Sequence, residues 1–182
     1  MNSRFLLSVA TVAVLSACAS QGPVMAPYSQ ASLPETVKVP AGHSVAMETS
    51  TSGGEITYQC LAKKDMADQF EWVFAGPAAG LKDRKGMMVG KYFGPPATWE
   101  SMDGSKITGT QVAVAPNGDG NIPNQLVKAN PAMGMGAMQG VSYIQRVATM
   151  GGTAPKTLCA KANEGEKQIV KYAADYIFYK AM

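Results

Sequence analysis

Few residues in this sequence could carry acid–base chemistry. His43 is the only histidine, so at most one imidazole could act as a hydrolytic base or a metal ligand. It follows Gly42 where a strand is expected to begin, and we expect it at the surface. Glu100 and Asp103 are close in sequence, and paired carboxylates are what a glycoside hydrolase requires. Because acidic side chains on a hairpin usually face solvent, a hydrolase is the alternative here and not the main expectation.

A second group of residues is suited to binding a ligand. Tyr92 and Trp99 lie on either side of a Gly-Pro-Pro segment, and Gln145 and Arg146 lie in an apolar stretch. An arginine in such a stretch should be paired or hydrogen-bonded, so Arg146 either ties strands together or contacts an anion or a sugar. Its candidate partners are Glu100, Asp103 and Asp175. The candidate ligand-binding residues are Tyr92, Trp99, Glu100, Asp103, Gln145 and Arg146.

Two features of the sequence resemble metal sites, a group of methionines and a loop rich in Asn, Asp and Gly. The chain has 12 methionines, and Met133, Met135 and Met138 share a glycine-rich segment. Thioethers suit Cu(I), but methionine also fills gaps or lies in loops, so copper binding is a further alternative only. Residues 117–121, Asn-Gly-Asp-Gly-Asn, resemble the start of a calcium loop, but Lys128 stands where a bidentate Glu is needed. We expect no metal and no other cofactor.

The N-terminus carries an export signal. Arg4 precedes an apolar run that is too short to span a bilayer and ends at Ser-Ala-Cys, as in a cleaved secretory signal. The Leu-Ser-Ala-Cys sequence resembles a bacterial lipoprotein signal, in which the cysteine is acylated. We therefore expect residues 1–17 to be a signal peptide and Cys18 to carry lipid. Ala19 in place of Asp implies sorting to the outer membrane, with the protein lipid-anchored and facing the periplasm or the cell surface.

The remaining cysteines predict a disulfide. With Cys18 assigned to lipid, Cys60 and Cys159 form the only possible pair, and an exported protein meets oxidising conditions. Residues 18–36 are rich in proline and polar residues and are expected to form a flexible tether. Residues 37–182 then form one globular domain, which the length of 182 residues also favours.

Short alternating segments separated by turns predict an all-β domain, a β-sandwich or barrel with at most minor helix. Asp103-Gly104 predicts a hairpin turn, and residues 117–121 a tight loop. The segment 169–179 fits both periods, but its aromatic and β-branched residues favour a strand. The predicted strands include residues 56–61, 69–74, 87–93, 107–114, 141–149 and 169–179.

Composition limits the classes of partner. The formal net charge is only +3 with 16% charged residues, which argues against nucleic acid as a partner. The expected partners are the membrane, through the lipid anchor, and a small molecule or saccharide.

A series of motifs in order resembles the Domain of Unknown Function 3455 family over about residues 37–179. The motifs are Tyr58-Gln59-Cys60, Trp72 with Gly76-Pro77-Ala78-Ala79-Gly80-Leu81, Gly94-Pro95, Trp99-Glu100, Asp103-Gly104-Ser105, Tyr143-Ile144-Gln145-Arg146, Thr149, Gly151-Gly152, Ala154-Pro155, Cys159 and Tyr172 to Tyr179. In the family pattern a histidine precedes the Gly-Pro segment, whereas here Tyr92 takes that place and Pro96-Ala97 is inserted. The resemblance therefore implies no histidine chemistry at this position, and it implies no particular activity. We expect an envelope lipoprotein that acts as a binding or structural module, and we lean against an enzyme.

Overall fold

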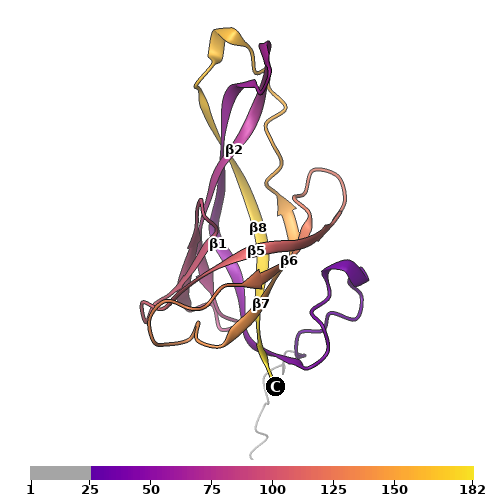
Figure 1. Cartoon of the computed structure of the whole chain (residues 1–182), viewed down its shortest axis with the longest axis vertical. Helices are drawn as coiled ribbons and strands as arrows, with labels where there is room; N and C mark the ends of the chain where they lie inside the picture. Colours follow the sequence, from indigo (N-terminus) through magenta and orange to yellow (C-terminus); the bar gives the residue numbers. More distant parts are fainter. Residues whose placement is uncertain (1–25) are drawn as a thin grey trace, which may run out of the picture.

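The computed structural model describes residues 26–182, which form eight antiparallel strands closed into one barrel (Figure 1). The strands are β1 (His43–Lys63), β2 (Met66–Lys82), β3 (Met88–Phe93), β4 (Thr98–Ser101), β5 (Lys106–Ala115), β6 (Asn124–Ala129), β7 (Val141–Gly151) and β8 (Lys167–Ala181). Each strand pairs with the next along the chain, and β8 returns to pair with β1. The all-β prediction is confirmed. The predicted signal peptide and Cys18 lie outside the described residues.

The C-terminal half of the last strand is buried on both of its faces. Tyr176 and Phe178 belong to the cluster inside the barrel, whereas Ile177 and Tyr179 belong to a second cluster on the outside. A strand with one buried face alternates apolar and polar residues. Here apolar residues lie on both faces, so this alternation is obscured and the apolar positions also match the spacing of a helix. The strand predicted over residues 169–179 is confirmed.

Two strands, β4 and β6, are not predicted from the sequence. β4 has only four residues, and β6 includes Asn124, Gln125 and Lys128, which weaken its apolar alternation. Both are held by neighbours on either side: Trp99 of β4, for example, pairs with Tyr92 of β3 and Ile107 of β5. Hydrogen bonding to the neighbouring strands therefore defines β4 and β6 more than the strand propensity of their own residues does.

The segment before β1 packs against the barrel. Tyr28, Leu33 and Val37, the last of these in the 3-10 helix η1 (Glu35–Val37), join the outer cluster on β5 to β8. The sequence placed residues up to 36 in a flexible tether, and the described part of this stretch departs from that prediction. Three apolar side chains spaced along a proline-rich stretch give no local period, although together they cover the outer face of the sheet.

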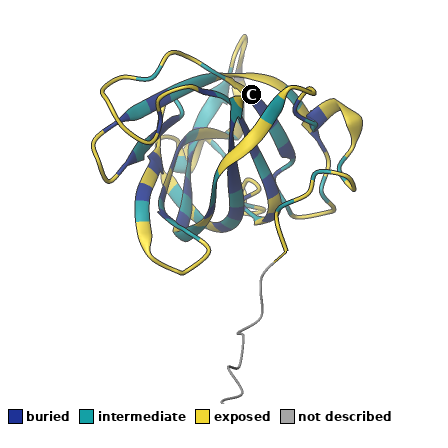
Figure 2. Ribbon diagram, turned by 90° about the horizontal axis from the view of Figure 1, so that it is seen from below, coloured by how far each residue is buried: buried dark blue, intermediate teal, exposed yellow. Residues whose placement is uncertain are grey.

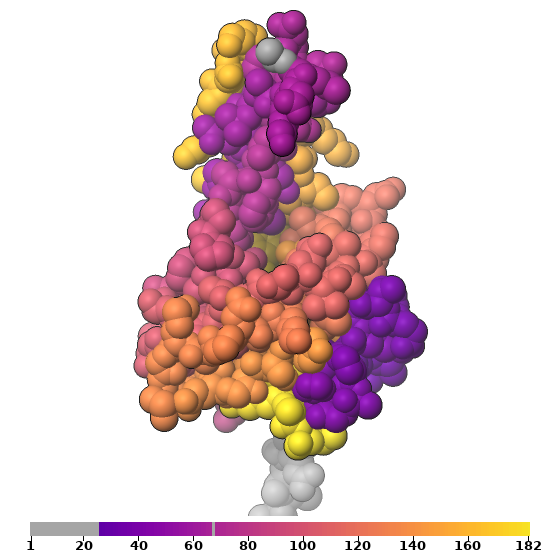
Figure 3. Space-filling model, viewed as in Figure 1, coloured from indigo at the N-terminus to yellow at the C-terminus, as the bar shows by residue number. Residues whose placement is uncertain are grey.

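Three strands extend beyond the barrel as an arm, seen at the top of Figure 1 and Figure 3. There the distal half of β1 pairs with β2 on one side and β8 on the other. A disulfide joins Cys60 of β1 to Cys159, with their Cα atoms 5.5 Å apart. It holds the segment between β7 and β8, which includes the 3-10 helix η2 (Lys161–Asn163), against the arm. The predicted disulfide is confirmed.

The two ends of the barrel differ. The loops at residues 83–87, 102–105 and 130–140 lie at the end that also holds the C-terminus, which we call the base; Figure 2 views the molecule from this end. The loops at 94–97 and 116–123 lie at the opposite end, beside the arm. The predicted turn at Asp103-Gly104 is confirmed: Gly104 has φ +85°, a conformation that glycine adopts without the strain of a Cβ.

Candidate functional site

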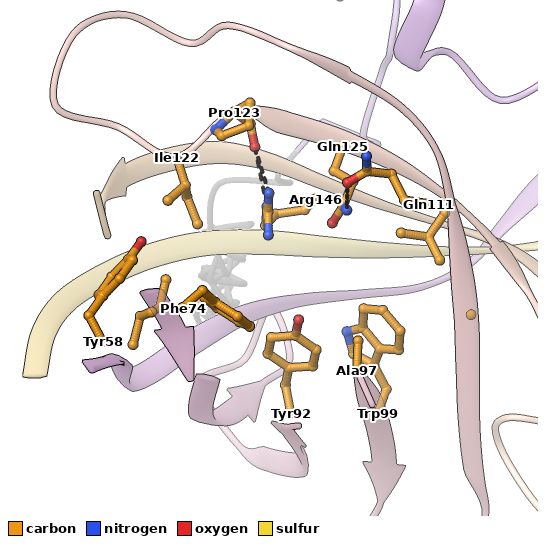
Figure 4. Close-up of a pocket in the computed structure, with 13 residues that line it drawn as sticks. Tyr58, Phe74, Tyr92, Ala97, Trp99, Gln111, Ile122, Pro123, Gln125 and Arg146 are labelled. Carbon is orange, nitrogen blue, oxygen red and sulfur yellow. Dashed lines mark hydrogen bonds between the residues drawn. The ribbon is translucent and has the colours of Figure 1, made fainter. Parts of the chain in front are cut away.

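A cavity of about 340 Å³ lies inside the barrel at the end next to the arm (Figure 4). It is lined by Ile56, Tyr58, Phe74, Tyr92, Ala97, Trp99, Gly109, Gln111, Ile122, Pro123, Gln125, Val127 and Arg146. Seven of the eight strands, all except β8, contribute to this lining. It is mostly apolar and aromatic, with a few polar groups, which is the usual composition of a small-molecule site.

Arg146 is the only charged residue among those that line the cavity. It projects from β7, and its Nε and Nη2 atoms donate hydrogen bonds to the carbonyl oxygen of Pro123 at 3.2 and 3.0 Å. No ion pair of Arg146 is found within residues 26–182, so the candidate partners Glu100, Asp103 and Asp175 are wrong. The expectation that Arg146 is hydrogen-bonded and ties strands together agrees with its two bonds to Pro123, just before β6. A guanidinium has five N–H donors, and the Pro123 carbonyl leaves its positive charge without a counter-charge.

The wall on the side of β3 and β4 is aromatic. Tyr92 and Trp99 stack with ring centroids 4.9 Å apart and planes at 26°, and Tyr176 packs edge-on or tilted against both. Trp99 is 1% exposed, and its Nε1 atom has no hydrogen-bond partner among the described residues. Buried donors nearly always have a partner. This indole N–H is therefore an unsatisfied donor buried in the wall of the cavity.

The hydroxyl groups in and beside the cavity are neutral at physiological pH. Burial raises the pKa of Tyr92 and raises that of Tyr172 to about 12, while the charge of Arg146 acts in the opposite direction on both. Burial also holds the pKa of Tyr176 well above its ordinary value. With the tyrosines protonated, Arg146 makes the electrostatic character of the cavity cationic.

Two further pairs of side chains line the cavity, one polar and one aromatic. Gln125 of β6 donates a hydrogen bond from Nε2 to Oε1 of Gln111 on β5, at 2.6 Å. Phe74 of β2 packs edge-on against Tyr58 of β1, with ring centroids 6.2 Å apart. None of these four residues was a candidate in the sequence. Tyr58 and Phe74 resemble core residues of alternating strands, and only the curvature of the barrel turns them toward a cavity.

Three of the six candidate ligand-binding residues, Tyr92, Trp99 and Arg146, meet in the cavity. Gln145 does not, because neighbours along a strand face opposite sides of the sheet. Its side chain accepts hydrogen bonds from the hydroxyls of Tyr28 and Tyr179 and donates to the carbonyl oxygen of Val37 at 2.6 Å. Gln145 thus ties the N-terminal segment to the outside of the barrel.

The two candidate carboxylates lie outside the cavity lining. Glu100 forms ion pairs with Lys91 and Lys106 at 3.4 and 3.3 Å. Asp103 accepts hydrogen bonds from the hydroxyl and amide of Ser105 and from the amide of Ala137. These bonds lower the pKa of Asp103 to about 2, so it is ionised at neutral pH and has no proton to donate as a general acid.

The methionines and the histidine that could bind a metal ion do not lie together. Met138 is buried in the main core, whereas Met133 and Met135 are exposed in their loop. The ring of His43 packs edge-on against Tyr143, with centroids 5.0 Å apart. Within residues 26–182, no three His, Cys, Asp or Glu side chains cluster in a way that could hold a metal ion.

The chain matches a known protein family over most of its length. The family model described as "Protein of unknown function (DUF3455)" matches residues 40–180. The chain belongs to the DUF3455 family. The matched residues of this DUF3455 domain include every residue that lines the cavity and both disulfide cysteines. The family predicted from the sequence motifs is confirmed.

The remaining comparisons add no relative of the DUF3455 domain. No curated protein matches the chain, and no solved structure matches it. Helices of the length and hydropathy needed to cross a bilayer are absent from the described part of the chain.

Proposed function

We propose that this protein is a binding module of the bacterial envelope, whose DUF3455 barrel takes a small ligand bearing an anionic group. An acylated Cys18 would hold it at the outer membrane. The observation that supports the binding role is Arg146: a guanidinium inside a cavity, with one backbone carbonyl as its only hydrogen-bond partner among the described residues. Arg146 is partly buried, and an anionic ligand would supply the counter-charge that its guanidinium lacks in the cavity.

The other residues of the cavity indicate which chemical groups, besides the anionic one, such a ligand would have. The stacked rings of Tyr92 and Trp99 offer a flat apolar surface, on which an aromatic ring or the apolar face of a sugar could lie. The Trp99 N–H is a free donor for a carbonyl or hydroxyl oxygen. A volume of about 340 Å³ lies at the lower end of the range of small-molecule sites, which favours a single ring over a polymer. We therefore propose a monocyclic carboxylate, aromatic or saccharide, as the ligand class.

Isothermal titration calorimetry of the mature chain tests this proposal. The probes are benzoate, cinnamate and glucuronate, with benzamide as the uncharged counterpart of benzoate. We expect at least one carboxylate to bind while benzamide binds more weakly. Arg146→Gln should weaken carboxylate binding roughly 10- to 100-fold, the effect of losing a charge-assisted hydrogen bond of about 1.5–3 kcal/mol.

The matched control is Lys128→Gln, which removes one positive charge from an exposed residue outside the cavity lining. It should leave affinity unchanged. Absence of binding by all three carboxylates, or an equal loss in the Arg146 and Lys128 variants, would reject the cavity as an anion site.

The anchor is tested separately in cells. Globomycin, an inhibitor of lipoprotein signal peptidase, should block processing of the wild-type chain, and the protein should fractionate with outer membranes. In Cys18→Ala, both the globomycin-sensitive processing and the fractionation with membranes should disappear. If the variant still fractionates with membranes, Cys18 is not the anchor.

A further inference from the structure

We propose that the base of the barrel lies on the phospholipid surface, so that the cavity opens away from the membrane. This inference rests on the proposed lipid anchor at Cys18. It concerns a different surface from the cavity, which we call the base face and define by Lys85, Met87, Met102, Met133 and Met135. Among the exposed side chains, the four methionines are 62, 72, 51 and 78% accessible, in that order.

These methionines come from three loops that are joined to one another at the base. The amide of Met102 donates to the carbonyl oxygen of Val89, just after the 83–87 loop. Asp103 bonds the amide of Ala137 in the 130–140 loop. Met133 exchanges two backbone hydrogen bonds with Lys106, just after the 102–105 loop. The three loops therefore lie next to one another at the base, and most of their residues are exposed.

The chain leaves the described part of the structure beside this surface. Nη1 of Arg84, in the 83–87 loop, donates to the carbonyl oxygen of Ala26 at 2.7 Å. Ala26 is eight residues after Cys18, and eight residues span at most about 29 Å when fully extended. An acyl chain on Cys18 therefore restricts the Ala26 end of the chain, and the base with it, to the neighbourhood of the bilayer.

The chemistry of the base face suits a lipid surface. Methionine side chains are flexible and apolar and adapt to irregular apolar surroundings, and several that are exposed together mark an interaction site more than isolated ones do. Lys85 adds an exposed positive charge and Asp103 in a neighbouring loop a negative one, so the attraction to lipid rests on the methionines. A lipid surface accommodates the four methionines without a complementary shape, whereas a folded protein partner would need one.

This orientation has a consequence for the cavity. Ala97, Ile122 and Pro123 line it from the end of the barrel opposite the base. The arm extends from that same end (Figure 1). With the base on the membrane, the cavity faces the aqueous compartment and the ligand enters from there.

Site-directed spin labelling of the full lipidated chain tests the orientation. The native cysteines are occupied by lipid and by the disulfide, so one introduced cysteine is the only free thiol. We would label Met102→Cys and Met135→Cys at the base, and Met66→Cys and Leu158→Cys on the arm, whose side chains are 52 and 80% exposed. The protein would be reconstituted in vesicles of phosphatidylethanolamine and phosphatidylglycerol.

We expect the base labels to become accessible to oxygen and protected from a water-soluble nickel chelate, while the arm labels remain accessible to the chelate. If the chain sediments with the vesicles but all four labels stay accessible to the chelate, the anchor holds and the docking proposal is wrong. If the chain fails to sediment, the anchor has failed and the docking proposal, which depends on it, fails too.

A second measurement tests whether the methionines of the base face make the contact with the bilayer. In the lipidated chain, the combined variant Met87→Glu, Met102→Glu, Met133→Glu should restore chelate accessibility at position 135 to the level of the arm. The matched control, Met66→Glu, Leu158→Glu, Ile169→Glu, changes three exposed apolar residues of the arm and should leave position 135 protected. Equal behaviour of the two variants would overturn the proposal.

Discussion

Tyr92 and Trp99 are direct cross-strand partners on β3 and β4, and their rings stack inside the barrel with centroids 4.9 Å apart. The pairing gives each ring a fixed orientation, because neighbouring strands set their distance and Tyr176 packs on both. The indole N–H has no partner among the described residues. This pair therefore provides a rigid aromatic surface, with one unsatisfied donor, in the wall of the cavity that Arg146 also lines.

The first prediction concerns that donor. Trp99→Phe removes the N–H and keeps an aromatic ring, so the affinity for the best-binding carboxylate should fall by roughly threefold to tenfold, which corresponds to one neutral hydrogen bond of about 0.5–1.5 kcal/mol. Calorimetric titration measures the loss. The matched control is Trp72→Phe, because the Trp72 N–H already donates to the carbonyl oxygen of Thr157 on the arm. An equal loss in the two variants would contradict a role for the Trp99 N–H.

The second prediction concerns Gln145, a ligand candidate that the structure places in an outer network. Gln145→Ala leaves the hydroxyls of Tyr28 and Tyr179 and the Val37 carbonyl without this partner. Unsatisfied buried groups cost about 1–3 kcal/mol each, so the free energy of unfolding should fall by about that amount or more. Urea denaturation measures it, with the exposed Gln69→Ala as control. Unchanged stability, or a loss of ligand affinity at unchanged stability, would contradict the structural role.

The third prediction concerns the disulfide. Replacing both Cys60 and Cys159 by Ala should lower the free energy of unfolding by about 2–5 kcal/mol, because the bond closes a long loop of 99 residues. Amide hydrogen exchange should increase most between residues 153 and 166, which the bond holds to the arm. Cys18→Ala serves as the control and should leave both measurements unchanged. Uniform exchange in the double variant would show that the bond does not act on this segment.

The fourth prediction is a pH dependence at the base. Hydrogen bonds from Ser105 and Ala137 lower the pKa of Asp103 from 3.8 to about 2 in the folded chain. A carboxyl whose pKa is depressed by folding stabilises the fold above its unfolded pKa, and that contribution is lost as the pH falls through the folded pKa. The melting temperature of Asp103→Asn should therefore lie below that of wild type at pH 7 and converge with it toward pH 2. Asp119→Asn, in an exposed loop, should show no such convergence, and a constant difference for Asp103→Asn would contradict the prediction.

Properties that depend on local sequence were predictable. The aromatic and β-branched residues in 169–179 indicated the last strand, and Asp103-Gly104 indicated the turn between β4 and β5, because residue propensity and turn chemistry act over a few residues. The pairing of Cys60 with Cys159 followed from counting, once Cys18 was assigned to lipid. The ordered family motifs led to the DUF3455 domain, which the family comparison confirms.

Properties that depend on strand register and closure required the tertiary structure. Arg146 and Gln145 are adjacent in sequence, yet one faces the cavity and the other faces the N-terminal segment, and only the closed sheet defines which side is inside. The Pro123 carbonyl is 23 residues from Arg146, and no local pattern predicts that contact. Tyr28 and Val37 likewise show no period of their own, but they pack on residues more than a hundred positions later in the chain. The sequence alone thus determined most of the strands, the disulfide and the family. The cavity arose from long-range pairing, because its lining residues come from seven strands that closure brings together.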